Sequence, residues 1–454
     1  MADILAIDVG TTTFKAGVFD PELRLKAEAS RTYQIRLYDR VKAEIDPEQW
    51  WGALRECCGQ LGKYLSDVDV LSLAVTTPGL VAMNTSGDAL FPAILFLDGR
   101  SHAQARDIRR RLGDAYFLEE ACNLPVSGGS SLASILWLRD EMPTVWKAAA
   151  KFGHCNTYMV KRLTGRWAID PSTTSITGLY GTARHDMTWL QPVLDCAELP
   201  EEKLPPLIPS HAPVDRILPQ VAVELGLPHK PVVLCGGNDA VLAALSAGLR
   251  EPGEISTVHG TCDITNVCVD RPVRSPNFNV RCHVLPNRWV TFFVLNTGGK
   301  ALEWYRSVFC RDMTEDQFFT DYLPHVLGAF LDDPEVDALE AQLPVYVPYL
   351  QGSRYSLEQL TAGFSGLTLQ TTREMILLSI VRGNLTYDGE NLKEVAGVVR
   401  IRREVMTTGG LARVPGFMRA KRRWAGDFDY RFQDQSSLRG AAILGQMAMQ
   451  GGNA

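Results

Sequence analysis

The fold is decided by residues 4–19, which read ILAIDVGTTTFKAGVF. Ile4–Ile7 and Phe14–Phe19 are apolar runs, and the turn that joins them is made of small and hydroxyl-bearing residues. Two strand-like runs separated by a glycine-containing turn predict a β-hairpin. The tip of this hairpin is expected to expose backbone N–H groups and threonine hydroxyls.

The same arrangement returns near the middle of the chain. Glu254–Val258 is strand-like, residues 259–263 form the turn, and Ile264–Val269 is the second strand. We interpret the recurrence as an internal duplication in which each half opens on a Gly-Thr hairpin. Two glycine-containing turns also arise by chance, so the pattern alone is a weak indication.

Strand patterns alternate with helical patterns in both halves of the chain. This alternation predicts an α/β protein with two domains, each built on a mixed or mostly parallel sheet. Leu249–Gly253 contains a proline and a glycine, and we place the boundary there, which gives domains 1–248 and 249–454. The proline-rich stretch 200–219 is expected to be a surface excursion without regular structure.

Composition excludes several classes of protein. The chain has 454 residues and a net charge of −6, which argues against a nucleic-acid or anionic-membrane partner. No run approaches 18 apolar residues, so no transmembrane helix is expected. The N-terminus lacks the basic and apolar regions of a signal peptide, and the ten cysteines form no CxxC pair. These features together favour a cytoplasmic protein.

The sequence lacks the two commonest nucleotide-binding loops. The sequence contains no GxxxxGK[ST] loop and no GxGxxG after a strand. It does contain three small-residue turns after apolar strands, at Gly10–Thr13, Gly260-Thr261 and Gly409-Gly410. Glycine lets a ligand approach the backbone, whose N–H groups can then hold phosphate oxygens. Each turn taken singly is more often an ordinary hairpin turn, but together they favour nucleotide phosphates.

One acidic residue stands at the end of a strand. Asp239 follows the strand Val232–Cys235 through a Gly-Gly-Asn turn and begins a small-residue helix. A carboxylate at this place is either a helix N-cap or a general base, because open α/β sheets bind ligands at the carboxyl ends of their strands. The local sequence does not decide between the two.

The motifs resemble those of a known family. Asp8–Thr12, Gly236–Asp239 and Gly260-Thr261 are similar to motifs of the FGGY carbohydrate kinases in the actin-like ATPase superfamily. The resemblance extends through Glu44–Trp51 and Thr407–Arg413 and covers nearly the whole chain. It implies two actin-like (ribonuclease H-like) domains with an interdomain cleft, and transfer of the ATP γ-phosphoryl group to a hydroxyl of a sugar or polyol.

The resemblance also implies roles for individual residues. Asp239 would be the catalytic base, and Asp8 would hold Mg²⁺. ATP would be bound by small, hydroxyl-bearing or basic residues, namely Gly10, Thr11, Thr12, Thr13, Lys15, Gly260, Thr261, Gly298, Gly299, Gly409, Gly410 and Ala412. The sugar pocket would contain Thr77, Asp98, Arg100 and Asp170. A surface ion pair is the alternative for Asp98 and Arg100, and a homodimer is usual among such relatives.

Several positions depart from the family pattern. The second phosphate turn continues as Cys262-Asp263, which would bring a negative charge near phosphates unless the side chain points away or helps to hold a metal. Thr77–Gly79 lacks the His and Met of pentulose kinases, which puts xylulose in doubt as the substrate. Met375 and Arg382 stand where a polar residue and an acid are usual. These departures keep open a non-catalytic or regulatory ATP-binding protein on the same fold, and a second rival is an actin-like ATPase that binds protein.

Overall fold

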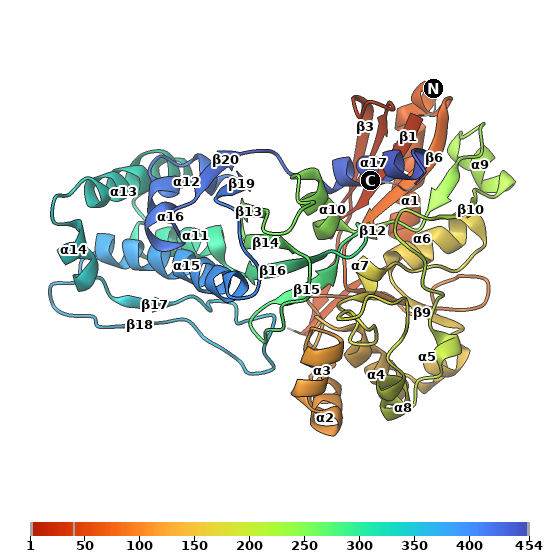
Figure 1. Ribbon diagram of the computed structural model, residues 1–454, viewed down its shortest axis with the longest axis horizontal. Coiled ribbons are helices and arrows are strands. Elements are labelled where there is room, and N and C mark those ends of the chain that lie inside the picture. The colour runs from red at the N-terminus through yellow and green to blue at the C-terminus, as the bar shows by residue number, and fades with distance from the viewer. Residues whose placement is uncertain (1–2, 40, 452–454) are drawn as a thin grey trace. The chain divides into compact units, whose positions relative to one another are not determined.

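The computed structural model describes residues 3–39 and 41–451, and the chain divides into two compact units (Figure 1). Unit 1 consists of residues 1–250, 274–290 and 435–454, and unit 2 consists of residues 251–273 and 291–434. The first change of unit therefore falls two residues after the predicted boundary. The chain then returns to unit 1 twice, which the prediction of two continuous domains does not include.

Unit 1 contains a mixed sheet with the order β10-β11-β6-β1-β2-β3, in which β12 also pairs with β6. Its strands are β1 (Asp3–Val9), β2 (Thr13–Phe19), β3 (Leu25–Thr32), β6 (Val68–Val75), β10 (Pro213–Arg216), β11 (Val232–Leu234) and β12 (Gly237–Asn238). All seven residues of β1 are buried, as expected for a central strand covered on both faces. β1 pairs antiparallel with β2 and parallel with β6, so the predicted hairpin is confirmed.

A second, five-stranded sheet in unit 1 has the order β4-β5-β8-β7-β9. Its strands are β4 (Arg36–Tyr38), β5 (Lys42–Ile45), β7 (Gly79–Met83), β8 (Ala93–Leu95) and β9 (Lys151–Gly153). The returning segment 274–290 contains β15 (Asn279–Cys282), which is not a strand of this sheet. β6 ends at Val75 and β7 begins at Gly79, so the short segment between them leads from one sheet to the other.

Helices pack around these sheets. The helices of unit 1 are α1 (Glu48–Leu61), η1 (Gly62–Leu65), α2 (His102–Leu112), α3 (Asp114–Glu120), α4 (Ser131–Glu141), α5 (Pro143–Ala148), α6 (Cys155–Thr164), α7 (Pro171–Thr174), α8 (Gln191–Ala197), η2 (Glu201–Lys203), α9 (Pro219–Leu225), α10 (Asp239–Ser246) and α17 (Ser437–Met449). The last helix packs on α10, β1 and β6 and is seen beside them in Figure 1. The C-terminal end of the described chain therefore completes the core that the first strand begins.

One expectation about unit 1 is wrong. The proline-rich segment 200–219 is not irregular throughout, because it contains η2 and the strand β10. β10 pairs with β11 at one edge of the first sheet. Proline cannot donate a ladder hydrogen bond but is tolerated at a sheet edge, which explains why Pro213 can begin this strand.

Unit 2 contains a mixed sheet whose strands run in the order β16-β14-β13-β19-β20. The strands of the unit are β13 (Ile255–His259), β14 (Asp263–Val269), β16 (Trp289–Leu295), β17 (Val345–Val347), β18 (Gly363–Ser365), β19 (Glu404–Thr408) and β20 (Asp429–Phe432). Its helices are α11 (Gly298–Phe309), α12 (Glu315–Gln317), η3 (Phe318–Tyr322), α13 (Leu323–Leu331), α14 (Val336–Gln342), α15 (Arg373–Ala396), η4 (Leu411–Arg413) and α16 (Phe417–Trp424).

The two central strands of unit 2 repeat the pattern of unit 1. β13 pairs antiparallel with β14 and parallel with β19, as β1 pairs with β2 and β6. The second predicted hairpin is therefore confirmed, and each hairpin stands beside a parallel strand. No helix in the described part of the chain is both long and apolar enough to cross a membrane.

Candidate active site

The first small-residue turn joins β1 to β2. The Gly10 backbone N–H donates to the Thr13 carbonyl over 3.0 Å, and the Thr76 N–H donates to the Val9 carbonyl over 2.8 Å. A Cβ added to Gly10 would lie 2.9 Å from the Thr13 oxygen, so this tight turn requires glycine. The Thr11 and Thr76 hydroxyls are 3.3 Å apart. The turn is held from both sides, while Thr12 at its tip stays exposed.

Asp8 lies at the carboxyl end of β1, beneath this turn. The Ser437 hydroxyl donates to its Oδ2 over 2.6 Å, and among the described residues no hydrogen bond engages Oδ1. Burial raises the pKa of Asp8, while Ser437 and the positive charge of Lys15, its direct cross-strand neighbour, lower it. Mg²⁺ in phosphate-transfer sites is held by one or two carboxylates together with water and phosphate oxygens. A single carboxylate with one uncommitted oxygen fits such a cation.

Asp239 is the first residue of α10, but it is not the helix cap. The Asn238 side chain accepts from the Val241 N–H over 3.0 Å and so fills the N-cap role that the sequence left open for Asp239. Asp239 Oδ1 accepts from the Ala240 N–H over 2.7 Å and from Asn238 Nδ2 over 3.0 Å. These bonds fix the direction of the carboxylate, and the side chain remains partly exposed.

The pKa of Asp239 is raised to about 7. Burial is the main cause, and the negative charge of Asp8 raises it as well, while Arg281 and the two hydrogen bonds act in the opposite direction. The repulsion between Asp8 and Asp239 shows that two carboxylates 231 positions apart in sequence belong to one electrostatic site in unit 1. Carboxyl groups with pKa values shifted toward neutrality gather at functional sites.

A series of buried hydrogen bonds holds Asn238, the residue that precedes Asp239. Asn238 donates through Nδ2 to the Thr77 hydroxyl over 2.6 Å, and its N–H donates to the Ser172 hydroxyl over 2.9 Å. Ser172 in turn donates to Asp170, which caps α7. Asp170 is fully buried, and its carboxylate oxygens also accept hydrogen bonds from the Asn156 amide and the Ser210 hydroxyl. Thr77 and Asp170 are thus brought close to the Asp239 backbone, in supporting positions.

The structure places Asp98 and Arg100 in a buried ion pair rather than a surface one. Their side chains are 0% and 3% exposed, and Arg100 also pairs with Glu44 over 2.7 Å. Both Asp98 oxygens are occupied, by Arg100 and by the Ala43 N–H. The Arg100 guanidinium lies 4.9 Å from the Trp137 ring centre. This pair connects β5 to the segment after β8. Contact of Asp98 or Arg100 with a sugar stays a prediction.

Sequence reasoning missed one basic residue of the site. Arg281 lies on β15, whose backbone is held by Asn123, which accepts from the Val280 N–H, and by Ser175, which accepts from the Cys282 N–H. Its positive charge acts on Asp239 and, together with burial, lowers the pKa of His154 to about 3. No motif marks this residue, because the segment 274–290 joins unit 1 only in three dimensions. Asn238, by contrast, could have been identified as a preferred N-cap residue.

In unit 2, three of the predicted nucleotide turns converge. The Gly299 N–H donates to the Gly260 carbonyl over 2.8 Å, and the Lys300 N–H donates to the Thr261 carbonyl over 3.3 Å. A Cβ on Gly299 would lie 2.5 Å from the Gly260 oxygen, and one on Gly409 would lie 2.2 Å from the His259 oxygen. The glycines are therefore needed for the turns to touch each other.

The outer face of these turns is open. A Cβ on Gly410 would meet no atom within 4 Å, and one on Gly260 would meet only the Cys262 carbonyl, at 3.9 Å. Ala412, in the short helix η4, is partly exposed, and Thr261 is exposed. Small residues with open space above exposed backbone form a cradle whose N–H groups can hold an anion such as phosphate.

Asp263 is buried against Gly298 and is not exposed at the open face of these turns. It is 2% exposed, and its Oδ1 accepts from His259 Nδ1 over 2.9 Å. A Cβ added to Gly298 would lie 2.4 Å from the carboxyl carbon of Asp263. The buried carboxylate therefore requires glycine at position 298. Burial and the hydrogen bond with His259 therefore keep the Asp263 carboxylate off the open face of the turns.

The network around Asp263 continues into the core of unit 2. His259 Nε2 accepts from Lys421, whose Nζ lies 4.0 Å from Asp388, and Asp388 accepts from the Thr265 hydroxyl over 3.0 Å. Lys421 is 1% exposed, and burial lowers its pKa to about 8. The network connects the second phosphate turn to α15 and α16.

The other departures have structural explanations. Arg382 donates to the carbonyls of Glu340, Leu343 and Pro344, at the end of α14. Met375 packs against the apolar core of unit 2. Both residues therefore stabilise the unit.

Comparison with known proteins identifies the family. The model of the FGGY family of carbohydrate kinases, N-terminal domain, matches residues 3–246. The chain belongs to the FGGY family of carbohydrate kinases. This FGGY kinase is 26% identical over 389 residues to a gluconokinase of Bacillus subtilis, covering 84% of this chain and 74% of the relative. It is 25% identical over 455 residues to the xylulose kinase of Escherichia coli, covering 98% and 90%.

Solved structures share the fold. The xylulose kinase from Rhodospirillum rubrum superposes with a TM-score of 0.89 at 21% identity, covering 100% of this chain and 91% of the other. The gluconate kinase from Lactobacillus acidophilus gives 0.88 at 19% identity, covering 99% and 89%. The FGGY kinase therefore has the two-domain actin-like ATPase fold. Its family membership makes it a carbohydrate kinase, and the family implies ATP and a small sugar as substrates.

Proposed function

We propose that this kinase transfers the γ-phosphoryl group of ATP to a hydroxyl of a sugar or polyol, with Asp239 as the general base. The observation that carries the assignment is the Asp239 carboxylate, which is fixed by two hydrogen bonds and has a pKa of about 7. A base with a pKa near the operating pH combines a sufficient ionised fraction with sufficient proton affinity. Asp239 would accept the proton of the substrate hydroxyl as the oxygen–phosphorus bond forms.

Asp8 is proposed to hold Mg²⁺ through Oδ1, the oxygen that Ser437 leaves uncommitted. The cation would neutralise charge on the phosphates, as in other phosphoryl transfers. Thr11, Thr12 and the Gly10–Thr13 turn would orient the terminal phosphates, and Lys15 would add a positive charge. In unit 2, the proposed nucleotide cradle is formed by Gly260, Thr261, Gly298, Gly299, Gly409, Gly410 and Ala412.

The substrate class is proposed from the relatives and from Arg281. The relatives named above act on a pentulose and on an aldonate. A positive charge that acts directly on Asp239 favours the negatively charged aldonate. We therefore expect gluconate or a related aldonate to be phosphorylated with a higher kcat/KM than xylulose. A coupled ADP assay across pentuloses, hexuloses, polyols and aldonates checks this ranking, which an equal or higher value for xylulose would reverse.

The base assignment is tested by Asp239→Asn. We expect kcat to fall by about 10³-fold, within the range known for general bases, while the affinity for ATP changes less than threefold. Asp195→Asn, which changes an exposed acid on α8, is the matched control and should keep full activity. An Asp239→Asn enzyme with more than a tenth of the original kcat would show that another group takes the proton.

A further inference from the structure

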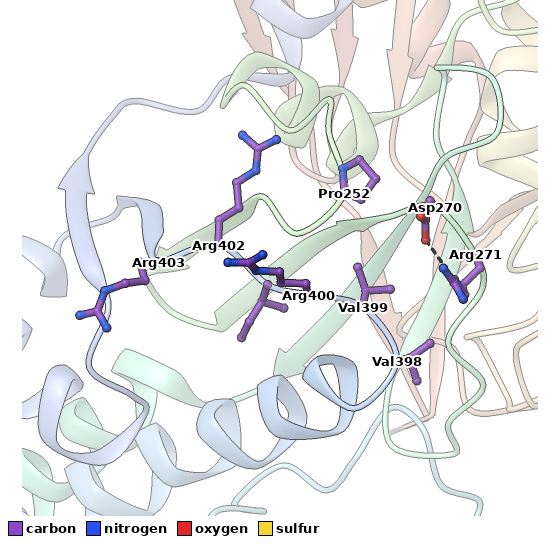
Figure 2. Close-up of a pocket in the computed structure, with 9 residues that line it drawn as sticks. Pro252, Asp270, Arg271, Val398, Val399, Arg400, Arg402 and Arg403 are labelled. Atoms are coloured by element: carbon purple, nitrogen blue, oxygen red, sulfur yellow. Dashed lines mark hydrogen bonds and ion pairs between the residues drawn. The ribbon is translucent and has the colours of Figure 1, made fainter.

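A large pocket lies in unit 2, outside every residue assigned above. Its volume is ≈ 640 Å³, within the range of small-molecule sites. It is formed where the loop after α15 meets the end of β14 and the turn before β13 (Figure 2). Its lining residues are Pro252, Asp270, Arg271, Val398, Val399, Arg400, Ile401, Arg402 and Arg403.

The lining of this pocket is rich in arginine. It contains four arginines and one aspartate, while Glu254, Asp427 and Asp429 pair with two of these arginines from outside the lining. Figure 2 shows Arg400 and Arg402 two positions apart on one loop, and the Asp270–Arg271 pair on a different segment. The arginines come from two separate segments, so the concentration of charge is a feature of the folded unit.

Three of these arginines form exposed ion pairs, which a ligand can replace. Arg271 pairs with Asp270 over 3.1 Å, Arg402 with Glu254 over 2.7 Å, and Arg403 with Asp427 over 3.3 Å and Asp429 over 3.8 Å. The three arginine side chains are 50–67% exposed, and exposed pairs contribute little stability, so a ligand can replace them at small cost. Arg400 forms no ion pair with any acid in the described part of the chain.

The rest of the lining is apolar. Pro252, Val398, Val399 and Ile401 supply hydrocarbon surface between the charged groups. A bare ion gains nothing from such surface, whereas a ligand with a carbon skeleton does. The guanidinium fork binds phosphoryl oxygens in a bidentate manner. The lining as a whole therefore matches a phosphorylated small molecule.

The backbone of the pocket is preformed. The Arg402 N–H donates to the Gly253 carbonyl over 2.8 Å, and a Cβ on Gly253 would lie 2.2 Å from the Arg400 oxygen. Gly253 has φ +87°, a conformation that favours glycine. This contact joins the starts of β13 and β19, which pair in parallel and carry predicted nucleotide turns at their other ends. Five residues of strand separate the two ends by roughly 15 Å.

We propose that this arginine-lined pocket is a second anion site of the kinase, which binds a phosphorylated sugar or a similar small phosphate ester. The phosphoryl group is bound by Arg400 and Arg402, together with Arg271 from a different segment. The carbon skeleton packs on Val398 and Pro252. Because the pocket lies at the opposite ends of the strands from the nucleotide turns, occupation of the two sites is not mutually exclusive.

Calorimetric titration of the full chain tests the proposal, with glucose 6-phosphate, inorganic phosphate and glucose as probes. We expect the ester to bind in the presence of saturating ATP analogue, and glucose to give no signal at the pocket. The double variant Arg400→Gln/Arg402→Gln should weaken binding of the ester at least tenfold. The matched control Arg311→Gln/Arg419→Gln, at exposed arginines elsewhere in unit 2, should leave it unchanged.

The outcomes separate the sources of the phosphoryl group. Ester binding at least tenfold tighter than phosphate supports a sugar phosphate, and equal affinities support a site for the phosphoryl group alone. Arg271→Gln, on a different segment, must weaken binding too, which guards against a local folding defect in the loop. If neither anion binds, or if the arginine variants bind as well as the original chain, the proposal is wrong.

Discussion

The carboxylate of Asp239 faces two opposing demands. To act as a base it must lose its proton near neutral pH, yet burial and the neighbouring Asp8 disfavour its charged form. Its pKa is about 7 in the folded chain, compared with about 3.9 for an aspartate in an unfolded chain. The folded state therefore binds the proton more tightly than the unfolded state. This residue weakens the fold progressively as the pH rises from about 4 to about 7, and the full cost is present above that range.

A pH series with Asp239→Asn is expected to show this trade between stability and activity. At pH 8 the variant should be more stable than the original chain, by up to about 4 kcal/mol for a shift of three pKa units. At pH 5 the two should differ little, because the aspartate is then protonated. Urea unfolding at the two pH values measures the difference. In the original enzyme, kcat/KM should rise with pH through about 7, and a flat profile between pH 6 and 8 would contradict the assignment.

At the scale of elements, a buried charge network fixes the second phosphate turn. His259 stands at the end of β13 and connects Asp263, at the start of β14, to Lys421 on α16 and through it to Asp388 on α15. Removal of one partner from a buried ionic network leaves an uncompensated charge, which costs more than the whole network contributes. The turn at Gly260-Thr261 is therefore linked by side chains to two helices, α15 and α16.

Lys421→Met is expected to destabilise the protein by about 3 kcal/mol, because Asp388 loses its countercharge and His259 Nε2 loses its donor. Lys421→Met/Asp388→Asn removes both charges and should recover more than half of that loss. Denaturant unfolding of the single and double variants measures the coupling. Additive losses in the double variant would mean that the two side chains do not interact. We also expect the KM for ATP to rise in Lys421→Met more than the KM for the sugar.

The sequence predicts the elements that repeat a pattern and misses those that depend on distant contacts. Both Gly-Thr hairpins could be predicted, because apolar runs and turn residues are local. β10 was missed because proline ordinarily excludes strands and only the sheet edge permits it. The burial of Asp98 and Arg100, and the inward direction of Asp263, depend on partners far apart in sequence. Arg281 was missed for the same reason.

At the scale of the whole molecule, unit 1 is assembled from three separate segments of chain. α17 comes from the last of them, and Gly440 on this helix approaches α10 so closely that an added Cβ would lie 2.0 Å from the Leu242 carbonyl oxygen. Three residues earlier on the same helix, Ser437 donates to Asp8. The packing of the final helix and the state of the proposed metal ligand are thus coupled.

Two glycine-to-alanine variants separate this packing from helix propensity. Gly440→Ala should destabilise the chain by about 1–3 kcal/mol, because the methyl group must push α17 away from the α10 backbone. The same substitution at Gly52, inside α1, meets no atom within 4 Å and should stabilise by about 0.5–1 kcal/mol, since alanine is the better helix former. Urea unfolding measures both. A shift of α17 also moves Ser437, so Gly440→Ala should lower kcat at a given Mg²⁺ concentration while Gly52→Ala should not. Equal effects of the two substitutions would show that the close approach of α17 to α10 does not control the site.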